Sequence, residues 1–180
     1  KELLELKDIE NVLEQYYNSG RFRHTLDFLL QAAGTEPFDF YRRLSGYWNQ
    51  KGHFNSSKNV NELYTILKCF AEDTFVNRLD KEQFSLLNEY MKLDWLLYVR
   101  SGSMPAAINR FNHAIIKEEI HGYIKNKLTD IDTFTDFKNL SLREILKQVG
   151  YEVFLRNIFA DTPSKNEIVM FFPLRPSSSK

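Results

Sequence analysis

Apolar residues recur three and four positions apart along most of the chain, and this spacing restricts most of it to helices that share an apolar core. Gly20, Gly34 and Gly52 separate the first groups of apolar residues, and glycine commonly ends helices. Pro37 stands where proline fits the first turn of a helix, and Asp8 is a suitable N-cap for the first one. The sequence therefore predicts three closely linked helices, with apolar faces at Ile9–Tyr16, Phe22–Ala33 and Phe38–Trp48.

Two pairs of residues have the spacing of a capping box, in which two side chains three positions apart bond each other's backbone amides. Asn59 with Glu62 opens one predicted helix, and Asp80 with Gln83 opens the next. The second of these helices is apolar nearly all round, so we expect it in the centre of a bundle. Further along, the spacing predicts one long helix over 108–128.

The period of the apolar pattern changes near the C-terminal end of the chain. Ser141 is expected to cap a short helix that ends before Gly150. Two runs rich in β-branched and aromatic residues, Val153–Phe159 and Glu167–Phe172, flank a polar loop, which is typical of a hairpin.

These patterns predict a mainly α fold, a bundle of six to seven helices with a small C-terminal β-hairpin. A chain of 180 residues suits one domain. We expect a single helical domain over 1–180, with the hairpin at about 151–174 and a frayed tail at 177–180.

The balance of charges and the single cysteine limit the class of protein. Lys plus Arg number 24 and Asp plus Glu number 24, so no net charge draws the chain toward nucleic acid. Cys69 is the one cysteine, which suits a reducing compartment, and we expect a cytoplasmic protein. The most apolar helix is interrupted by Glu89, Lys92 and Asp94, so no membrane-spanning segment is expected.

The usual motifs of nucleotide binding and nucleophilic catalysis are missing from the sequence. The seven glycines are scattered singly, so no glycine-rich loop can surround a phosphate with amides. No Gly-x-Ser-x-Gly elbow occurs, and Cys69 is expected to be a small buried hydrophobic residue rather than a nucleophile. We therefore predict no catalytic residue in this chain.

Glu118 and His121 have the spacing of half of a carboxylate-bridged di-metal site. The other half, a second Glu-x-x-His, does not occur, so a solvated helix face is the favoured interpretation and no metal ligand is predicted. His113 is interpreted as a residue at the edge of the core with one nitrogen hydrogen-bonded, rather than as a catalytic base.

Asp94 is the most unusual charged residue, because helical spacing places its carboxylate on an apolar face beside Trp95. Ionisation there is costly without a partner. A structural pairing with an arginine or with a helix end is favoured over a catalytic role.

Basic and aromatic residues gather around the first predicted helix junctions and form a candidate binding surface. Such groups can hold a phosphate or a stacked base, although helix ends also attract basic residues. The candidate surface consists of Tyr16, Tyr17, Arg21, Arg23, His24, Arg42, Arg43, Trp48 and Asp94.

Five short segments carry a resemblance to a known family. They are Tyr16-Tyr17-Asn18-Ser19-Gly20-Arg21-Phe22, Leu26-Asp27-Phe28-Leu29, Pro37-Phe38-Asp39-Phe40-Tyr41, Tyr47-Trp48 and Leu93-Asp94-Trp95-Leu96-Leu97. Together they resemble the uncharacterised C-terminal domain of cobalamin-binding radical SAM proteins of anaerobic bacteria. The resemblance covers most of the chain and consists of helix-packing and capping residues.

The resemblance implies a parent enzyme that binds cobalamin in an N-terminal domain, and a 4Fe–4S cluster with S-adenosylmethionine in a central barrel. This chain would be its non-catalytic accessory end, which packs on the barrel and shapes substrate access. It holds no cofactor itself, because Cys69 alone cannot supply a Cys-x-x-x-Cys-x-x-Cys array and no Asp-x-His-x-x-Gly cobalamin motif occurs.

The expected partners are the cobalamin-binding and radical SAM domains of the same polypeptide, with no membrane and no nucleic acid. The alternative is a free-standing helical module that binds another protein or an RNA through the basic and aromatic junctions.

Overall fold

The computed structural model describes residues 2–99, 103–110, 112–159 and 168–173, and it divides the chain into two compact units. Unit 1 is Lys1–Asn109 and unit 2 is Arg110–Lys180, whereas the sequence predicts one domain over 1–180. The described residues of each unit contain a separate cluster of buried apolar side chains. The predicted tail at 177–180 lies outside the described residues.

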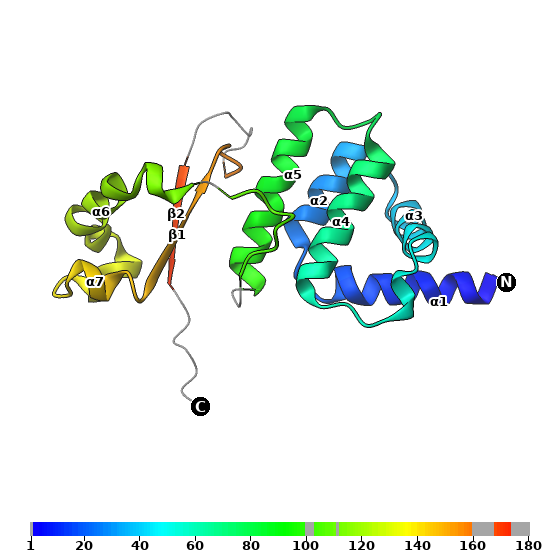
Figure 1. Ribbon diagram of the computed structural model, residues 1–180, viewed down its shortest axis with the longest axis horizontal. Helices are drawn as coiled ribbons and strands as arrows, with labels where there is room; N and C mark the ends of the chain where they lie inside the picture. Colours follow the sequence, from blue (N-terminus) through cyan, green and yellow to red (C-terminus); the bar gives the residue numbers. More distant parts are fainter. Residues whose placement is uncertain (1, 100–102, 111, 160–167, 174–180) are drawn as a thin grey trace. The chain divides into compact units, whose positions relative to one another are not determined.

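Within the described residues, unit 1 is a bundle of five α-helices (Figure 1). They are α1 (Glu2–Leu13), α2 (Arg23–Ala33), α3 (Pro37–Gln50), α4 (Val60–Phe75) and α5 (Lys81–Asp94). Two helices continue into π-helical turns, α1 at Glu14–Asn18 and α5 at Trp95–Val99. α2 packs against α5, and α1 packs against α3.

The helix ends in unit 1 follow from local chemistry. Gly34 ends α2 with φ 56°, a left-handed conformation that glycine adopts without steric cost. Pro37 is the first residue of α3. The predicted capping boxes that begin with Asn59 and Asp80 are both confirmed, at the starts of α4 and α5.

Aromatic side chains fill the centre of unit 1. The ring centroid of Phe22 lies 5.0 Å from that of Tyr16 and 4.4 Å from that of Tyr64. The Phe40 ring lies 5.5 Å from the Phe70 ring, and all five side chains are fully buried. Since Phe22 immediately precedes α2, this packing fixes the start of α2 in the core.

The described residues of unit 2 form a two-stranded antiparallel sheet and two short α-helices. These elements are α6 (Lys117–Asn126), α7 (Leu142–Ile145), β1 (Val149–Phe154) and β2 (Ile168–Pro173), with 3₁₀ turns at His113–Ile115, Leu128–Asp130 and Asp132–Phe137. In the sheet, Val149 pairs with Pro173 and Phe154 pairs with Ile168. Both helices lie on the same side of the hairpin (Figure 1), and Ile120, Ile124 and Ile145 are buried in the core of this unit.

The mainly helical fold with a small C-terminal hairpin is confirmed, and Ser141 caps α7 as predicted. The prediction of a single long helix over 108–128 is wrong, because α6 begins only at Lys117. The Asn112 side chain accepts a hydrogen bond from the amide of Ala114, which stabilises a 3₁₀ turn in place of the continuous helix. The first strand also begins and ends earlier than predicted, since β1 is Val149–Phe154.

No helix in the part of the chain that the structure describes combines the length and the apolarity that crossing a bilayer requires.

Candidate functional site

The carboxylate of Asp94, the last residue of α5, accepts hydrogen bonds from the first turn of α2. Oδ1 accepts from the backbone amide of His24 at 3.1 Å, and Oδ2 accepts from the backbone amide of Thr25 at 2.8 Å. The Thr25 hydroxyl donates to Oδ2 at 2.7 Å. Phe22, at the N-cap position, supplies no side-chain cap, so Asp94 satisfies amides that α2 leaves without acceptors. The predicted pairing of Asp94 with a helix end is confirmed.

The imidazole of His24 contacts the same carboxylate. Its Nδ1 lies 2.8 Å from Oδ1 of Asp94, and its ring stacks on Tyr98 with 6.0 Å between centroids. The His24 side chain is 35% exposed, whereas that of Asp94 is fully buried. A carboxylate that accepts from Nδ1 favours the tautomer in which Nε2 carries the free lone pair. A histidine oriented in this way can accept a hydrogen bond or bind a ligand through Nε2.

Burial raises the pKa of Asp94 above its ordinary value of 3.8, against the opposing effect of hydrogen bonds from Thr25 and His24. The stability that Asp94 contributes is therefore fully present below its ordinary pKa and decreases as the pH rises through the folded-state pKa. We expect Asp94→Asn, which cannot ionise, to cost less free energy of unfolding near pH 7 than at about pH 3. Urea unfolding of both proteins at the two pH values measures this, and a cost that increases with pH would contradict it.

Tyr16 and Trp48, two members of the candidate surface, lie in the core of unit 1. Their rings meet edge to face at 6.0 Å, and the Tyr16 hydroxyl donates to the backbone oxygen of Leu63 at 3.1 Å. Burial raises the pKa of the Tyr16 hydroxyl. Because both side chains are buried, as Asp94 is, they stabilise the bundle and do not form part of an exposed surface.

Two buried tyrosines of unit 1 differ in whether their hydroxyl is hydrogen-bonded. The hydroxyl of Tyr16 has Leu63 as its acceptor, whereas that of Tyr41 has no partner among the described residues. We expect Tyr16→Phe to cost about 1 kcal/mol of unfolding free energy and Tyr41→Phe to change it by less than about 0.5 kcal/mol. Urea unfolding of the two variants tests this, and equal losses would contradict it.

The remaining residues of the candidate surface, apart from His24, are exposed: Tyr17, Arg21, Arg23, Arg42 and Arg43. The Arg42 Nη2 lies 2.8 Å from Oδ1 of Asp39, an exposed ion pair that contributes little stability. Among the described residues, Arg21, Arg23 and Arg43 have no ion-pair partner. The structure thus joins His24 to Asp94 and leaves these basic groups in solvent.

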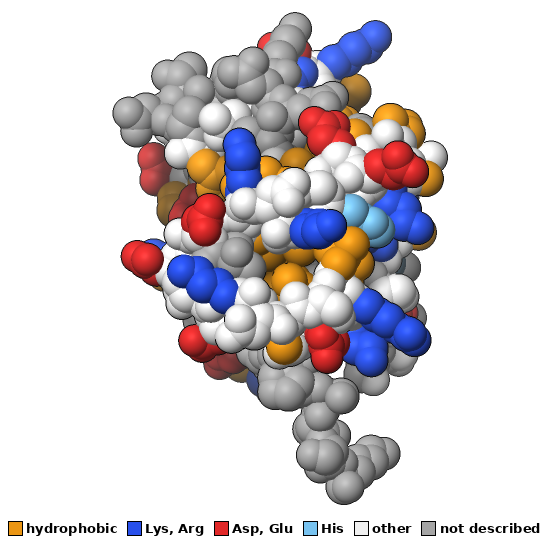
Figure 2. Space-filling view, turned by 90° about the vertical axis from the view of Figure 1, so that its left-hand side faces the viewer, with side chains coloured by type: hydrophobic (Ala, Val, Ile, Leu, Met, Phe, Trp, Pro, Cys, Tyr) orange, Lys and Arg blue, Asp and Glu red, His pale blue; other side chains and the backbone are white. Residues whose placement is uncertain are grey.

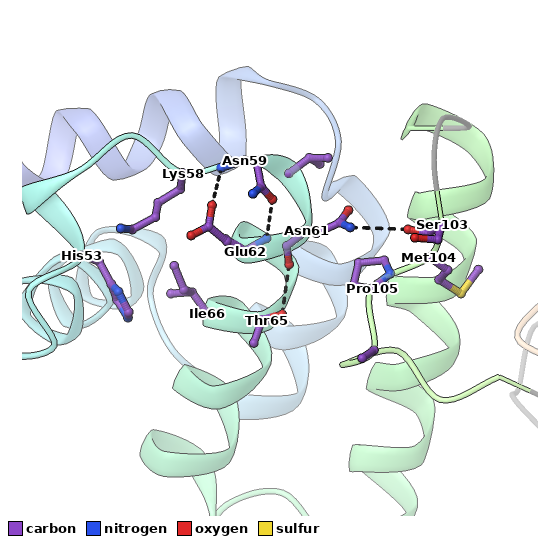
Figure 3. Close-up of a pocket in the computed structure, with 12 residues that line it drawn as sticks. His53, Lys58, Asn59, Asn61, Glu62, Thr65, Ile66, Ser103, Met104 and Pro105 are labelled. Atoms are coloured by element: carbon purple, nitrogen blue, oxygen red, sulfur yellow. Dashed lines mark hydrogen bonds between the residues drawn. The ribbon is translucent and has the colours of Figure 1, made fainter.

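A pocket of about 800 Å³ lies at the start of α4 (Figure 3). Its polar side chains bond mainly to nearby groups: Asn59 and Glu62 form the capping box, and the Thr65 hydroxyl donates to the backbone oxygen of Asn61 at 3.0 Å. Desolvation lowers the pKa of His53, and the nearby lysines lower it further. The capping box and the Thr65 hydrogen bond therefore hold the start of α4 in place.

Three other residues considered from the sequence have clear positions. Cys69 is exposed, so its expected burial is wrong. Glu118 is exposed on α6 and His121 is partly buried. In residues 2–99, 103–110, 112–159 and 168–173, no three or more His, Cys, Asp or Glu side chains are grouped as metal ligands would be.

Another buried carboxylate, that of Glu152 on β1, is not apparent from the sequence patterns. Its Oε2 accepts from Nε and Nη2 of Arg110 at 3.2 and 3.1 Å, and its Oε1 lies 2.8 Å from Nε2 of His113. The hydrogen-bonded nitrogen expected for His113 is therefore confirmed. The sequence signal that could have indicated this pairing is Glu152 itself, a single charged residue among the apolar residues of β1, because a buried charge requires partners.

A family model described as "Protein of unknown function (DUF4080)" matches residues 1–172. Searches of curated proteins and of solved structures return no match. The family match includes the described residues of both units, apart from Pro173.

Proposed function

Because this chain belongs to the DUF4080 family, whose function is unknown, we propose that it is the non-catalytic C-terminal domain of a cobalamin-dependent radical SAM enzyme. In this proposal the chain packs on the catalytic barrel and shapes substrate access, and the enzyme works in the cytoplasm. The support comes from the resemblance in the segments Tyr16–Phe22, Pro37–Tyr41 and Leu93–Leu97.

One structural observation supports a non-catalytic role. The four buried Asp, Glu and Lys side chains of the described residues are Glu89, Lys92, Asp94 and Glu152, and each is engaged by a partner. Nζ of Lys92 lies 3.1 Å from Oε2 of Glu89. Asp94 accepts hydrogen bonds from the start of α2, and Glu152 accepts them from an arginine and lies within hydrogen-bond distance of a histidine. Groups held in this way stabilise the fold, whereas a catalytic acid or base needs access to substrate.

The cofactors of the proposed enzyme belong to its other domains. A 4Fe–4S cluster of this class is held by three cysteines, and the chain has Cys69 alone, so the residues present do not fit the cluster. The parent's cofactors would supply the radical chemistry, and this domain would contribute binding surface.

The first turns of α1 provide a surface for contact with the rest of the enzyme. Leu3, Leu4 and Leu6 are 77%, 68% and 54% exposed, which is unusual for three leucines on one short segment. Glu2 and Glu5 lie beside them and Lys7 follows, so residues 2–7 form an apolar surface with a net negative charge. We expect it to contact an apolar and basic surface of the catalytic part of the same polypeptide.

Binding between separately produced parts of the enzyme tests the proposal. Calorimetric titration of this chain into the preceding cobalamin and radical SAM domains should give saturable binding. Replacing Leu3 and Leu6 by lysine should weaken that binding at least about tenfold, because it removes apolar area and introduces charge repulsion.

The matched control is Val76→Lys, which changes another exposed apolar residue of unit 1 that is 61% exposed. It should leave the affinity within about twofold. No binding by the wild-type chain, or equal weakening by both changes, would argue against the proposed contact.

The alternative function is a free-standing module that binds another protein or an RNA. The observation in its favour is the exposed position of Arg21, Arg23 and Arg43 without ion-pair partners among the described residues, with Tyr17 65% exposed. Binding to single-stranded RNA that weakens with increasing salt would support this alternative.

A further inference from the structure

Unit 2 contains an apolar pocket of about 770 Å³. It is lined by residues of α6, of both strands and of the segment that includes Ile131 and Phe134. Figure 2 views the molecule from the side of α6 and α7 and shows hydrophobic side chains exposed among charged ones on that face. A pocket of this size suits a small ligand, since such sites combine apolar walls with a few polar groups.

Aromatic rings form part of the pocket wall. The rings of Tyr123, on α6, and Phe171, on β2, stack at 5.4 Å with 9° between their planes. Tyr123 is 39% exposed, so part of it stays in contact with solvent. The face of an aromatic ring attracts a positive charge, and this attraction strengthens as water is excluded.

A carboxylate lines the described part of the pocket wall. Among the described residues that line the pocket, Glu119 is the one Asp, Glu, Lys, Arg or His, and its side chain is exposed on the first turn of α6. In the part of the chain that the structure describes, it has no hydrogen-bond or ion-pair partner. A negative charge beside apolar walls favours a cationic ligand and disfavours an anionic one.

We propose that this pocket binds a small organic cation, an apolar body that carries one ammonium or amidinium group. The apolar body would lie against Ile116, Ile120 and Met170, and the positive charge would lie between Glu119 and the ring of Tyr123. All of these residues belong to unit 2, so the site does not depend on whether the chain packs on a catalytic barrel.

Two probes of equal length and opposite charge test the proposal. Octylammonium and octanoate are titrated separately into the full chain, and the methyl signals of Ile116, Ile120 and Met170 are followed by NMR. Octylammonium should shift these signals in a saturable way, and octanoate should bind at least about threefold more weakly.

The charge of Glu119 is then removed without a large change in shape. Glu119→Gln should weaken octylammonium about threefold to tenfold and should remove most of the difference between the two probes. The control is Glu118→Gln, which removes the neighbouring exposed charge that does not line the pocket and should leave the affinity nearly unchanged. Equal binding of the two probes, equal weakening by the two variants, or no saturable shift with octylammonium would overturn the proposal.

Discussion

Replacing Asp94 by alanine should lower the free energy of unfolding of unit 1 by about 3–5 kcal/mol. The carboxylate is fully buried and accepts from the backbone amides of His24 and Thr25 and from the Thr25 hydroxyl. Alanine leaves these donors without an acceptor at the point where α2 meets α5. Tryptophan fluorescence during urea unfolding reports the loss, because both tryptophans, Trp48 and Trp95, are buried in the core of this unit.

Asp39→Ala is the matched control for this change. Asp39 also pairs with a side chain, that of Arg42, but both are about half exposed. Its loss should cost less than about 0.5 kcal/mol. If Asp94→Ala cost no more than Asp39→Ala, the account of Asp94 as the cap of α2 would be wrong.

Replacing Phe22 by alanine should cost about 3–5 kcal/mol of unfolding free energy. The ring is fully buried and packs against Tyr16 and Tyr64, so its removal leaves a cavity at the start of α2. Phe22 also belongs to one of the segments that carry the family resemblance. A large loss would show that Phe22 stabilises the packing of unit 1.

Tyr17→Ala provides the comparison within the same segment. Tyr17 is 65% exposed, so its replacement should change the unfolding free energy by less than about 0.5 kcal/mol. Urea unfolding of both variants gives the comparison. A loss for Tyr17→Ala as large as that for Phe22→Ala would contradict the packing of unit 1 described above.

Local chemistry allowed much of unit 1 to be predicted from the sequence. Gly34, Pro37 and the two capping boxes act within one turn of their own position, so their effects can be read from neighbouring residues. The first helix is different, because Asp8 was the predicted cap and α1 begins at Glu2. Residues 2–7 consist of leucine, glutamate and lysine, which favour helix without burial, so α1 extends beyond its buried face.

Contacts between distant residues account for most of what the sequence did not predict. The helical spacing around Asp94 indicated that its carboxylate needs a partner. It did not show that this partner is the start of α2, which lies far away in the chain. Glu152 is buried in β1 because its carboxylate accepts hydrogen bonds from Arg110 and lies within hydrogen-bond distance of His113. Burial of Cys69 was expected because Phe70 is next to it, but neighbouring residues on a helix point in different directions.

The candidate binding surface was predicted only in part, for the same reason. Tyr16 and Trp48 satisfy an aromatic pattern equally well in a core or on a surface, and their burial depends on the packing of α4 and of the turn at His53–Asn55. Arg21, Arg23 and Arg43 are exposed, as long basic side chains usually are. The pocket of unit 2 could not be predicted from the sequence, because its walls come from α6 and from the hairpin, which pack together only in the folded chain.

The most direct test of the proposed function is the DNA sequence of the reading frame that precedes the codon for Lys1. The account predicts that this frame is open and encodes a Cys-x-x-x-Cys-x-x-Cys array, preceded by an Asp-x-His-x-x-Gly cobalamin motif. A start codon immediately before Lys1 would contradict it, because the chain would then have no catalytic part of its own polypeptide to contact.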